Sequence, residues 1–189
     1  MTGYTSIEDP HFEPFPKIAR LSREIVVTEK IDGTNAQVFI TDDGRVLAGS
    51  RTRWLTPESD NFGFAAWVHA NQFNLKQLGQ GHHYGEWWGA GVQRGYGLSE
   101  RRFSLFDVDR WQDWKPDCCH VVPVLYRGDF DTAAINEALD LLRDEGSRAA
   151  PGYRNPEGVI IYHTAADMMF KKTIHRDDVP KTRHAKGKS

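Results

Sequence analysis

Short runs of β-branched and aromatic residues, bounded by turn residues, predict that most of this chain folds into strands. The predicted strands cover residues 24–29, 36–40, 45–50, 83–88, 103–108, 121–126, 158–163 and 168–173. Asp43-Gly44 separates the second run from the third and is a strong β-hairpin signal. Residues 31–35 contain Asp-Gly and predict another tight turn, while the glycines up to Gly97 predict a loop after residue 88.

Two segments carry apolar residues at helical spacing instead. Residues 61–78 are the first, with Phe64, Trp67 and Val68 on one side. In residues 132–145 the apolar stripe consists of Ile135, Ala138, Leu139 and Leu142. Gly146 suits the end of this second helix. Strands mixed with two helices, without regular βαβ alternation, predict an α+β fold with mostly antiparallel sheets.

A length of 189 residues predicts a single domain spanning residues 1–189, large enough to bury its own core. Residues 1–17 predict an irregular N-terminal arm, because Pro14 and Pro16 interrupt any regular element. Residues 174–189 predict a polar, basic tail with Arg176, Lys181, Arg183, Lys186 and Lys188. This tail is expected either to be a solvated terminus or to contact an RNA backbone.

Composition narrows the function classes only slightly. Lys and Arg total 24 against 26 Asp and Glu, so a net charge of −2 gives no global basic field for nucleic acid. No apolar run approaches 18 residues and the N-terminus has no apolar signal region, so we expect a cytoplasmic protein without membrane contact. The only cysteines, Cys118 and Cys119, are adjacent, which disfavours a disulfide framework or a structural zinc site.

Candidate chemistry begins at Glu29-Lys30-Ile31-Asp32-Gly33-Thr34-Asn35, where a lysine separates a predicted strand from a tight turn. One interpretation is a solvated lysine before a turn. The other is a lysine nucleophile whose neutral amine attacks the α-phosphate of a nucleotide. Nearby cations would favour the neutral amine.

Further patterns follow this lysine in a fixed order. They are Ser50-Arg51-Thr52, Tyr84-Gly85-Glu86-Trp87-Trp88-Gly89, Phe103-Ser104-Leu105-Phe106-Asp107-Val108, Pro156-Glu157-Gly158-Val159-Ile160-Ile161 and Met169-Phe170-Lys171-Lys172. Together they resemble the ordered motifs of covalent nucleotidyltransferases, the polynucleotide ligases and capping enzymes. The resemblance covers roughly residues 14–173 and implies the ATP-grasp-like adenylation fold of ligases, with mostly antiparallel sheets flanked by helices.

Within that superfamily the chain looks most similar to ATP-dependent RNA ligases of the double-strand nick-sealing type. Asn35 stands where DNA ligases and capping enzymes commonly carry Arg, and the segment 85–96 also resembles an RNA ligase branch. NAD-dependent ligases need an added N-terminal module, for which residues 1–17 are too short. GTP capping is disfavoured because Asn35 departs from the capping pattern.

The resemblance places the residues around the lysine in a nucleotide site, namely Glu29, Ile31, Asp32, Gly33 and Asn35. Lys30 would become the lysyl-AMP. Glu29 would contact the adenine edge, partly through its main chain, while Asp32 and Gly33 would shape the turn. Asn35 would lie near the phosphate or the nick.

The remaining motifs imply the other contacts to ATP. Arg51 would bind a phosphate with its forked donors, although Arg51 and Arg53 could also be surface charges. Glu86 would contact the ribose hydroxyls, or could be a solvent-facing strand residue.

Two further groups complete the implied site. Phe106, or Phe103 beside it, would stack on adenine, while the alternative for each is a place in the core; Asp107 could simply cap a turn. Glu157 would bind Mg²⁺ or Mn²⁺, directly or through water, or could be a turn carboxylate.

The last motif departs from the family pattern. The family usually offers two lysines separated by one residue, whereas Lys171 and Lys172 are adjacent here. Neighbouring side chains of a strand face opposite sides, so only one can hold the α-phosphate, and Lys171 is favoured because it directly follows the apolar run. Larger relatives also continue into a C-terminal domain. We expect none here, and a protein partner or the basic tail would supply that grip on RNA.

The resemblance implies an enzyme that joins RNA 3′-hydroxyl and 5′-phosphate ends, or seals a nicked duplex, through a lysyl-AMP and an adenylylated RNA. A DNA-nick ligase, or a nucleotidyltransferase with another polynucleotide acceptor, is one alternative. A nucleic-acid binding module that has lost the chemistry is the other, and the intact Lys30, Glu86 and Glu157 argue against it.

Overall fold

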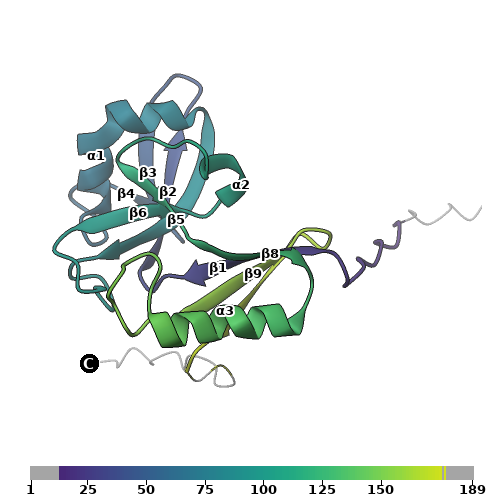
Figure 1. Ribbon diagram of the computed structural model, residues 1–189. Coiled ribbons are helices and arrows are strands. Elements are labelled where there is room, and N and C mark those ends of the chain that lie inside the picture. Colours follow the sequence, from purple (N-terminus) through teal and green to yellow (C-terminus); the bar gives the residue numbers. More distant parts are fainter. Residues whose placement is uncertain (1–12, 176, 178–189) are drawn as a thin grey trace, which may run out of the picture.

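Two β-sheets form the framework of the protein (Figure 1). The structure is a computed structural model that describes residues 13–175 and 177. The smaller sheet has four strands in the order β10-β9-β1-β8, all antiparallel. Its strands are β1 (Glu24–Lys30), β8 (Val124–Asp129), β9 (Gly158–His163) and β10 (Met168–Thr173). β1 is therefore a central strand, and it ends at Lys30.

The larger sheet has six strands in the order β4-β3-β2-β5-β6-β7. They are β2 (Thr34–Ile40), β3 (Val46–Ser50), β4 (Trp54–Leu55), β5 (Gly81–Gly89), β6 (Arg101–Leu105) and β7 (Cys119–Val121). All neighbours are antiparallel except β6 and β7, which run parallel. The mixed content and the antiparallel pairing confirm the predicted α+β class.

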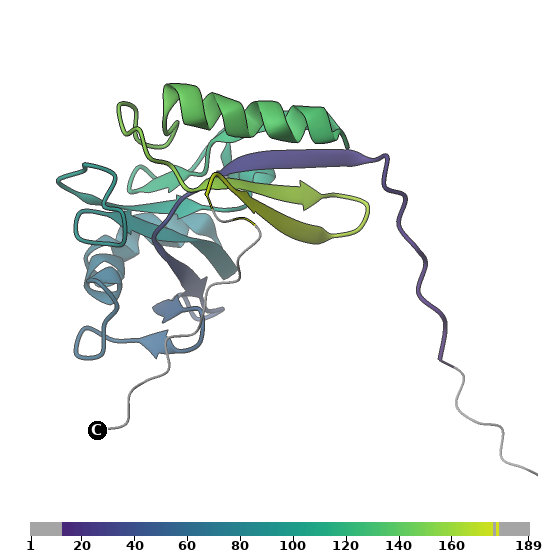
Figure 2. The same ribbon diagram turned by 90° about the horizontal axis from the view of Figure 1, so that it is seen from below.

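Each sheet buries one face under a helix. α1 (Phe64–Leu75) continues into a 3₁₀ turn, η1 (Lys76–Leu78), and packs on the six-stranded sheet. α3 (Thr132–Glu145) lies along one face of the four-stranded sheet, as Figures 1 and 2 both show. α2 (Val108–Trp111) is a single turn after β6.

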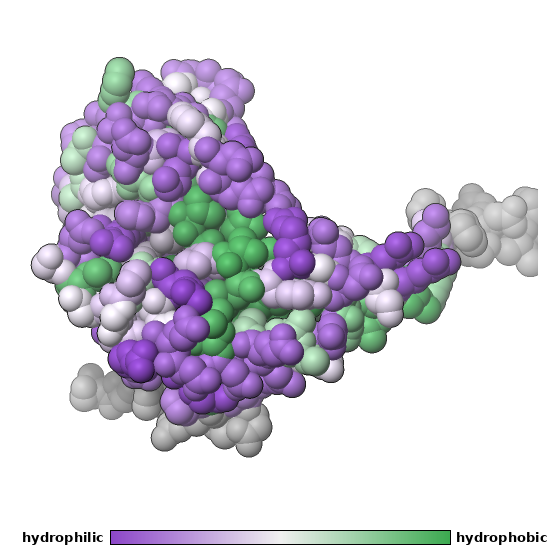
Figure 3. Space-filling model, viewed as in Figure 1, coloured by the Kyte–Doolittle hydropathy of each residue, from purple (hydrophilic) through white to green (hydrophobic). Residues whose placement is uncertain are grey.

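A third hydrophobic cluster joins the two sheets. The faces of the two sheets that lie opposite the helices both contribute to it. Its buried residues are Val26, Ile31, Trp88, Tyr96, Val108, Val122 and Ala150. Figure 3 shows hydrophobic side chains gathered in the hollow between the two lobes, with hydrophilic side chains around them. The turn after Lys30 runs along this seam, because Ile31 is buried there.

The helix predicted at 132–145 and the strands predicted at 158–163 and 168–173 are confirmed at those bounds. Asp131 caps α3 by accepting from the backbone N–H of Ala133, and Gly146 ends the helix at φ 89°. The first helix begins at Phe64 rather than at residue 61, because the Asp60 carboxylate caps it by accepting from Ala65 and Ala66 N–H.

Two predicted strands are corrected. The strand predicted at 103–108 ends at Leu105, because the Asp107 side chain accepts from the backbone N–H of Arg110 and starts α2, which takes up Val108. The strand predicted at 121–126 is two strands in different sheets. The chain crosses from β7 to β8 at Val122 and Pro123, and the carbonyl of Pro123 accepts from the N–H of Glu29.

The ends of the chain are described only in part. Residues 13–17 of the predicted arm have no regular structure, and Phe15 is exposed. The basic residues expected in the tail lie outside the described residues. Among residues 13–175 and 177, no helix is long and apolar enough to cross a membrane. Cys118 and Cys119 are both free thiols.

Candidate nucleotide site

The candidate nucleophile Lys30 forms an ion pair with Glu157. Lys30 ends β1, and the β1–β9 register pairs it with Gly158, so Glu157 immediately before β9 lies beside it. Lys30 Nζ lies 2.5 Å from Glu157 Oε2, with side chains 21% and 6% exposed. The lysine is therefore held in a fixed place rather than solvated.

Glu86 of β5 reaches the same turn from the six-stranded sheet. Its Oε1 accepts from Gly33 N–H at 3.0 Å, and its Oε2 accepts from the side-chain amide of Asn35 at 3.3 Å. Burial raises the pKa of Glu86 to about 7, while the Gly33 N–H and the Lys30 cation oppose that rise. The turn and the two sheets thus meet around one buried carboxylate.

Gly33 is required here by close packing. A Cβ atom on Gly33 would lie 2.4 Å from the carbonyl oxygen of Trp87 and 2.7 Å from Trp88 Cβ. Only a residue without a side chain lets the turn approach β5 closely enough for Glu86 to accept from its backbone.

Arg94 and Tyr96, for which no role was predicted, hold the turn from the glycine-rich loop. Arg94 Nε donates to Asp32 Oδ2 at 2.8 Å, and its Nη1 donates to the carbonyls of Asn155 and Pro156 at 2.9 and 3.3 Å. Tyr96 OH accepts from Asp32 N–H at 2.8 Å, and burial raises the pKa of Tyr96. Arg94 thereby ties the turn after Lys30 to the segment before Glu157.

The sequence carried a weak signal for these two residues. Gly91 and Gly95 flank the pair Gln93 and Arg94 in the loop, and Gln93 and Tyr96 themselves adopt positive φ values of 45° and 51°. Closely spaced glycines around a lone arginine indicate a tightly folded loop that presents it. Nothing in the sequence alone says which carboxylate that arginine meets.

The role expected of the Glu29 side chain is corrected. Its carboxylate is buried and accepts from Ser147 Oγ at 2.6 Å and from the backbone N–H groups of Arg148 and Ala149 at 2.8 and 2.9 Å. Burial raises the pKa of Glu29, and these donors oppose the rise. Three donors occupy the carboxylate, so Glu29 fixes the loop after α3 and does not offer its side chain to adenine.

Lys171 and Lys172 point to opposite faces of the four-stranded sheet. Lys172 pairs with Val159, whose side chain packs under α3, and its Nζ donates to Asn136 Oδ1 of α3 at 2.6 Å. Lys171 pairs with Ile160, which in turn pairs with Thr28 on the face that carries Lys30. Of the two candidates, Lys171 is therefore the lysine on the Lys30 face, and Lys172 lies on the face that α3 covers.

The two candidate arginines after β3 also separate. Arg53 Nη1 donates to the carbonyl and the hydroxyl of Ser59 at 2.8 and 2.9 Å, so it closes its own loop. Arg51 is exposed and makes no ion pair with another described residue. Arg51 directly follows Ser50, which pairs with Ala36 next to Asn35, so it is the arginine available at this edge of the site.

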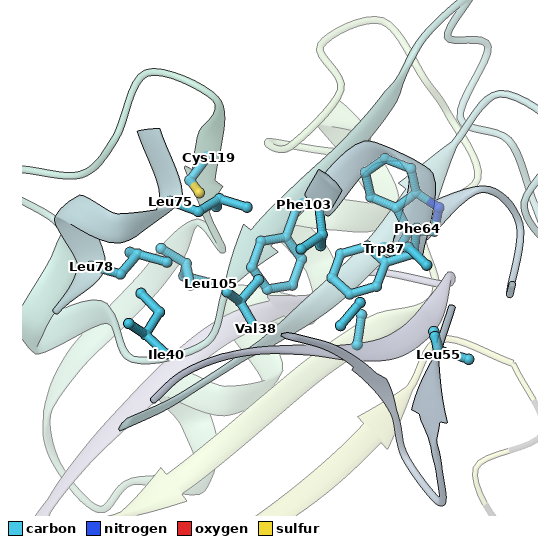
Figure 4. Close-up of a cluster of buried hydrophobic side chains, with 14 of the residues drawn as sticks. Val38, Ile40, Leu55, Phe64, Leu75, Leu78, Trp87, Phe103, Leu105 and Cys119 are labelled. Atoms are coloured by element: carbon cyan, nitrogen blue, oxygen red, sulfur yellow. The ribbon is translucent and has the colours of Figure 1, made fainter. Parts of the chain in front are cut away.

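Of the two candidate rings, Phe103 lies in the core, the alternative given for it above. Its ring is fully buried beside Phe64, with ring centroids 5.2 Å apart (Figure 4). The ring of Trp67 lies 5.8 Å away. Phe106 is only half-buried and packs at the seam between the sheets, where Ile31 also lies. Of the two, only Phe106 has a ring surface that a base could reach.

The resulting site can carry out chemistry on an anionic substrate. An amine on β1 pairs with a carboxylate from the start of β9 and lies near enough to a carboxylate from β5 to lower its pKa, with Lys171 on the same sheet face. Ile31, buried in the seam, and Asp32, held by two partners, fix the backbone on the far side of the amine. This arrangement suits attack by the amine on a phosphorus atom whose charge is met by nearby cations.

Solved structures of the Naegleria gruberi RNA ligase have a similar fold. A mutant without ligand matches with a TM-score of 0.59 and 21% identity over 80% of this chain and 50% of that chain. A mutant with ATP and Mn gives 0.60 and 20% over 82% and 51%, and a form with PPi gives 0.58 and 23% over 80% and 50%. The chain thus spans about half the length of the proteins that it matches.

Sequence similarity to a protein family identifies the chain more specifically than its fold does. No curated protein is similar enough to count as a match. The family model described as RNA ligase matches residues 23–174, which is most of the chain and includes Lys30, Glu86, Glu157 and Lys171. The chain therefore belongs to the RNA ligase family.

Proposed function

We propose that this chain is the nucleotidyl-transfer unit of an ATP-dependent RNA ligase that joins 3′-hydroxyl and 5′-phosphate ends. The observation that carries the proposal is the Lys30–Glu157 pair at 2.5 Å, enclosed by a turn that donates to Glu86. Membership of the RNA ligase family supports it, as does a similar fold in a Naegleria gruberi RNA ligase with ATP and Mn.

In the first step the Lys30 ammonium loses a proton and its amine attacks the α-phosphorus of ATP. A P–N bond forms, the bond from the α-phosphorus to the bridging oxygen breaks, and pyrophosphate leaves with that electron pair. Lys171 and Arg51 are the cations that would meet phosphate charge as it develops. Phe106 would stack on adenine, and the main chain of Glu29 would meet its edge.

Two transfers complete the cycle. A terminal 5′-phosphate oxygen of the RNA attacks the lysyl-AMP phosphorus, and the Lys30 amine leaves. The RNA 3′-hydroxyl then attacks the activated 5′-phosphate, forms the phosphodiester and releases AMP. Asn35, which pairs with Glu86 across β2 and β5, would lie near the phosphate or the nick during this exchange.

The carboxylate Glu157 fits a hard divalent cation such as Mg²⁺ or Mn²⁺. Among residues 13–175 and 177 no group of three His, Cys, Asp or Glu side chains lies close enough to enclose a metal, so phosphate and water oxygens would complete the coordination. Such an ion would neutralise phosphate charge during transfer.

Intact-protein mass spectrometry tests the proposal. With ATP and Mg²⁺ we expect a gain of about 329 Da, one AMP on a lysine nucleophile, and none with GTP or NAD. Lys30→Ala is the matched control and should show no gain while keeping the same circular dichroism. A protein without the adduct, after removal of any AMP already bound, would contradict the proposal.

The acceptor is tested separately with nicked duplexes. Sealing should require RNA at the 3′-hydroxyl side, whereas equal sealing with DNA on both sides would indicate a DNA-nick ligase. A full-length protein that seals only with a second protein present would indicate that a partner provides the grip on RNA.

A further inference from the structure

Four aromatic side chains form a row on the open face of the six-stranded sheet. They are Trp54 on β4, Phe39 on β2, and His82 and Tyr84 on β5. Phe39 and His82 stack with centroids 4.3 Å apart, His82 and Tyr84 are nearly parallel at 5.7 Å and 6°, and Phe39 and Trp54 lie 5.8 Å apart. We call these four residues the aromatic row.

The aromatic row is uncovered in the described structure. Trp54 is 51% exposed and Tyr84 is 55% exposed, and the helix α1 covers the opposite face of the sheet. Single exposed rings are common on protein surfaces, but contiguous exposed apolar patches usually mark an interaction site.

The row continues directly from the candidate nucleotide site. The β2–β5 register pairs Asn35 with Glu86, then Gln37 with Tyr84, then Phe39 with His82. All of these side chains share one face, because they are separated by two residues along each strand, about 6.6 Å a step. The rings therefore lead away from Glu86 along the surface of the same sheet.

Hydrogen bonds hold the middle of the row in place. Gln37 donates from Nε2 to the carbonyl of Ser50 at 3.2 Å, which turns its Oε1 toward His82 Nδ1 at 2.8 Å. His82 Nδ1 therefore carries a proton and donates it to Gln37. A ring fixed before binding loses less conformational entropy when a ligand stacks on it.

We propose that the aromatic row is a stacking platform for unpaired bases of the RNA strand next to the end being joined. The proposal rests on the proposed function, which places RNA at the Glu86 end of the row. Trp54 and Tyr84, the exposed rings at the two ends of the row, offer apolar ring surface on which bases can stack, and such stacking tolerates any sequence. Bases within a perfect duplex are already stacked on one another, so the row selects unpaired bases.

The test measures binding of a fluorescent single-stranded RNA by anisotropy. The double variant Trp54→Ala/Tyr84→Ala should bind at least roughly 5- to 150-fold more weakly, which is the loss expected for one stacked base. Trp54→Phe/Tyr84→Phe keeps the rings and should restore most of the affinity. Because the rings are uncharged, the ratio of wild-type to variant affinity should stay constant as salt rises.

Phe73→Ala is the matched control, because Phe73 is an 83% exposed ring on α1, on the other face of the sheet, and should not affect binding. Unchanged RNA binding by the double alanine variant, or an equal loss for a blunt, fully paired duplex, would overturn the proposal. Adduct formation with ATP alone is measured in parallel and should be equal in all variants. Its absence from the wild type would refute the proposed ligase, while the effect of the variants on RNA binding would still decide the role of the row.

Discussion

Lys30 Nζ and Glu157 Oε2 lie 2.5 Å apart, although 127 residues separate them in the chain. The antiparallel register of β1 and β9 creates this contact by setting Lys30 opposite Gly158. The pair is therefore a product of sheet topology, and the residues that fix the two segments should matter as much as the pair itself.

Lys171→Ala and Lys172→Ala should differ sharply although the lysines are neighbours. Lys171 lies on the Lys30 face, and loss of one cation that meets developing phosphate charge slows such reactions roughly 100- to 1000-fold. Lys172 contacts Asn136 of α3 instead, so its loss should leave the rate of adduct formation unchanged. Mass spectrometry at timed intervals measures both rates, and equal slowing by the two variants would contradict the assignment of faces.

Arg94→Ala should slow adduct formation roughly 10- to 100-fold, although Arg94 has no assigned contact with the nucleotide. Its loss would release the turn after Lys30, and small displacements of reacting groups slow reactions by about that factor. Arg94→Lys should fail to restore the rate, since one ammonium cannot reproduce the forked contacts to Asp32 and two carbonyls. Arg45→Ala is the control, because Arg45 forms an exposed ion pair with Asp43.

A double-mutant cycle separates this positioning role of Arg94 from general destabilisation. Asp32→Asn and Arg94→Ala should be strongly non-additive in the rate of adduct formation, because each removes the same contact. Additive effects would indicate that the ion pair does not connect the two segments.

Gly33→Ala should both destabilise the protein and reduce adduct formation. The added methyl would meet Trp87 backbone and Trp88 Cβ, and overpacking of this kind costs about 1–3 kcal/mol. Gly97→Ala is the control, because a Cβ there has no neighbour within 4 Å and only the positive φ of 67° is unfavourable. Urea unfolding measures both variants, and a Gly33→Ala protein as stable and active as the wild type would contradict the close packing.

Glu86→Gln should change how stability depends on pH. The pKa of Glu86 is raised from 4.5 to about 7, so the folded state binds this proton more tightly than the unfolded state does. The wild type should therefore lose stability relative to the variant as pH rises from 4.5 to 7, by at most about 3 kcal/mol. Above pH 8 the difference should be constant, which is the internal control. A difference that is flat from pH 4 to pH 8 would refute the raised pKa.

Glu29→Ala should cost about 2–4 kcal/mol in the free energy of unfolding, because it leaves two backbone N–H groups and the Ser147 hydroxyl without their acceptor. Ser147→Ala removes only one of these donors and should cost about 1 kcal/mol. Urea denaturation gives both values. A larger loss for Ser147→Ala than for Glu29→Ala would show that the carboxylate does not organise the loop.

Local signals in the sequence were sufficient where each element carried its own boundaries. The helix Thr132–Glu145 has an amphipathic stripe, the cap Asp131 and the stop Gly146, so pattern and turn chemistry agree. The strand predicted at 121–126 failed because apolar residues continue across Val122 and Pro123, while the chain changes sheets there. Hydrophobic periodicity indicates which residues are buried, but it does not indicate which sheet they belong to.

The site was predictable where motif residues contact one another, and not where a side chain serves the framework. Glu86 and Glu157 were singled out from their motifs, and the fold brings both to Lys30. Glu29 looks equivalent in sequence, but its carboxylate accepts hydrogen bonds from three donors in a loop about 118 residues further along the chain. Arg94 was missed for the same reason, since its partners become visible only when the loop folds back onto the turn.

The seam between the two sheets couples ligand binding at the site to the stability of the fold. Lys30 and Lys171 belong to one sheet, while Glu86 belongs to the other and Arg51 directly follows a strand of that other sheet. A molecule held by both sides acts as a reversible crosslink that exists only while the sheets are joined. By mass action, such a ligand at a concentration 100 times its Kd adds about 2.7 kcal/mol to the stability of the joined state. Occupancy of the site and integrity of the fold are thus coupled quantities, so the loaded protein should resist heat and proteases better than the empty one.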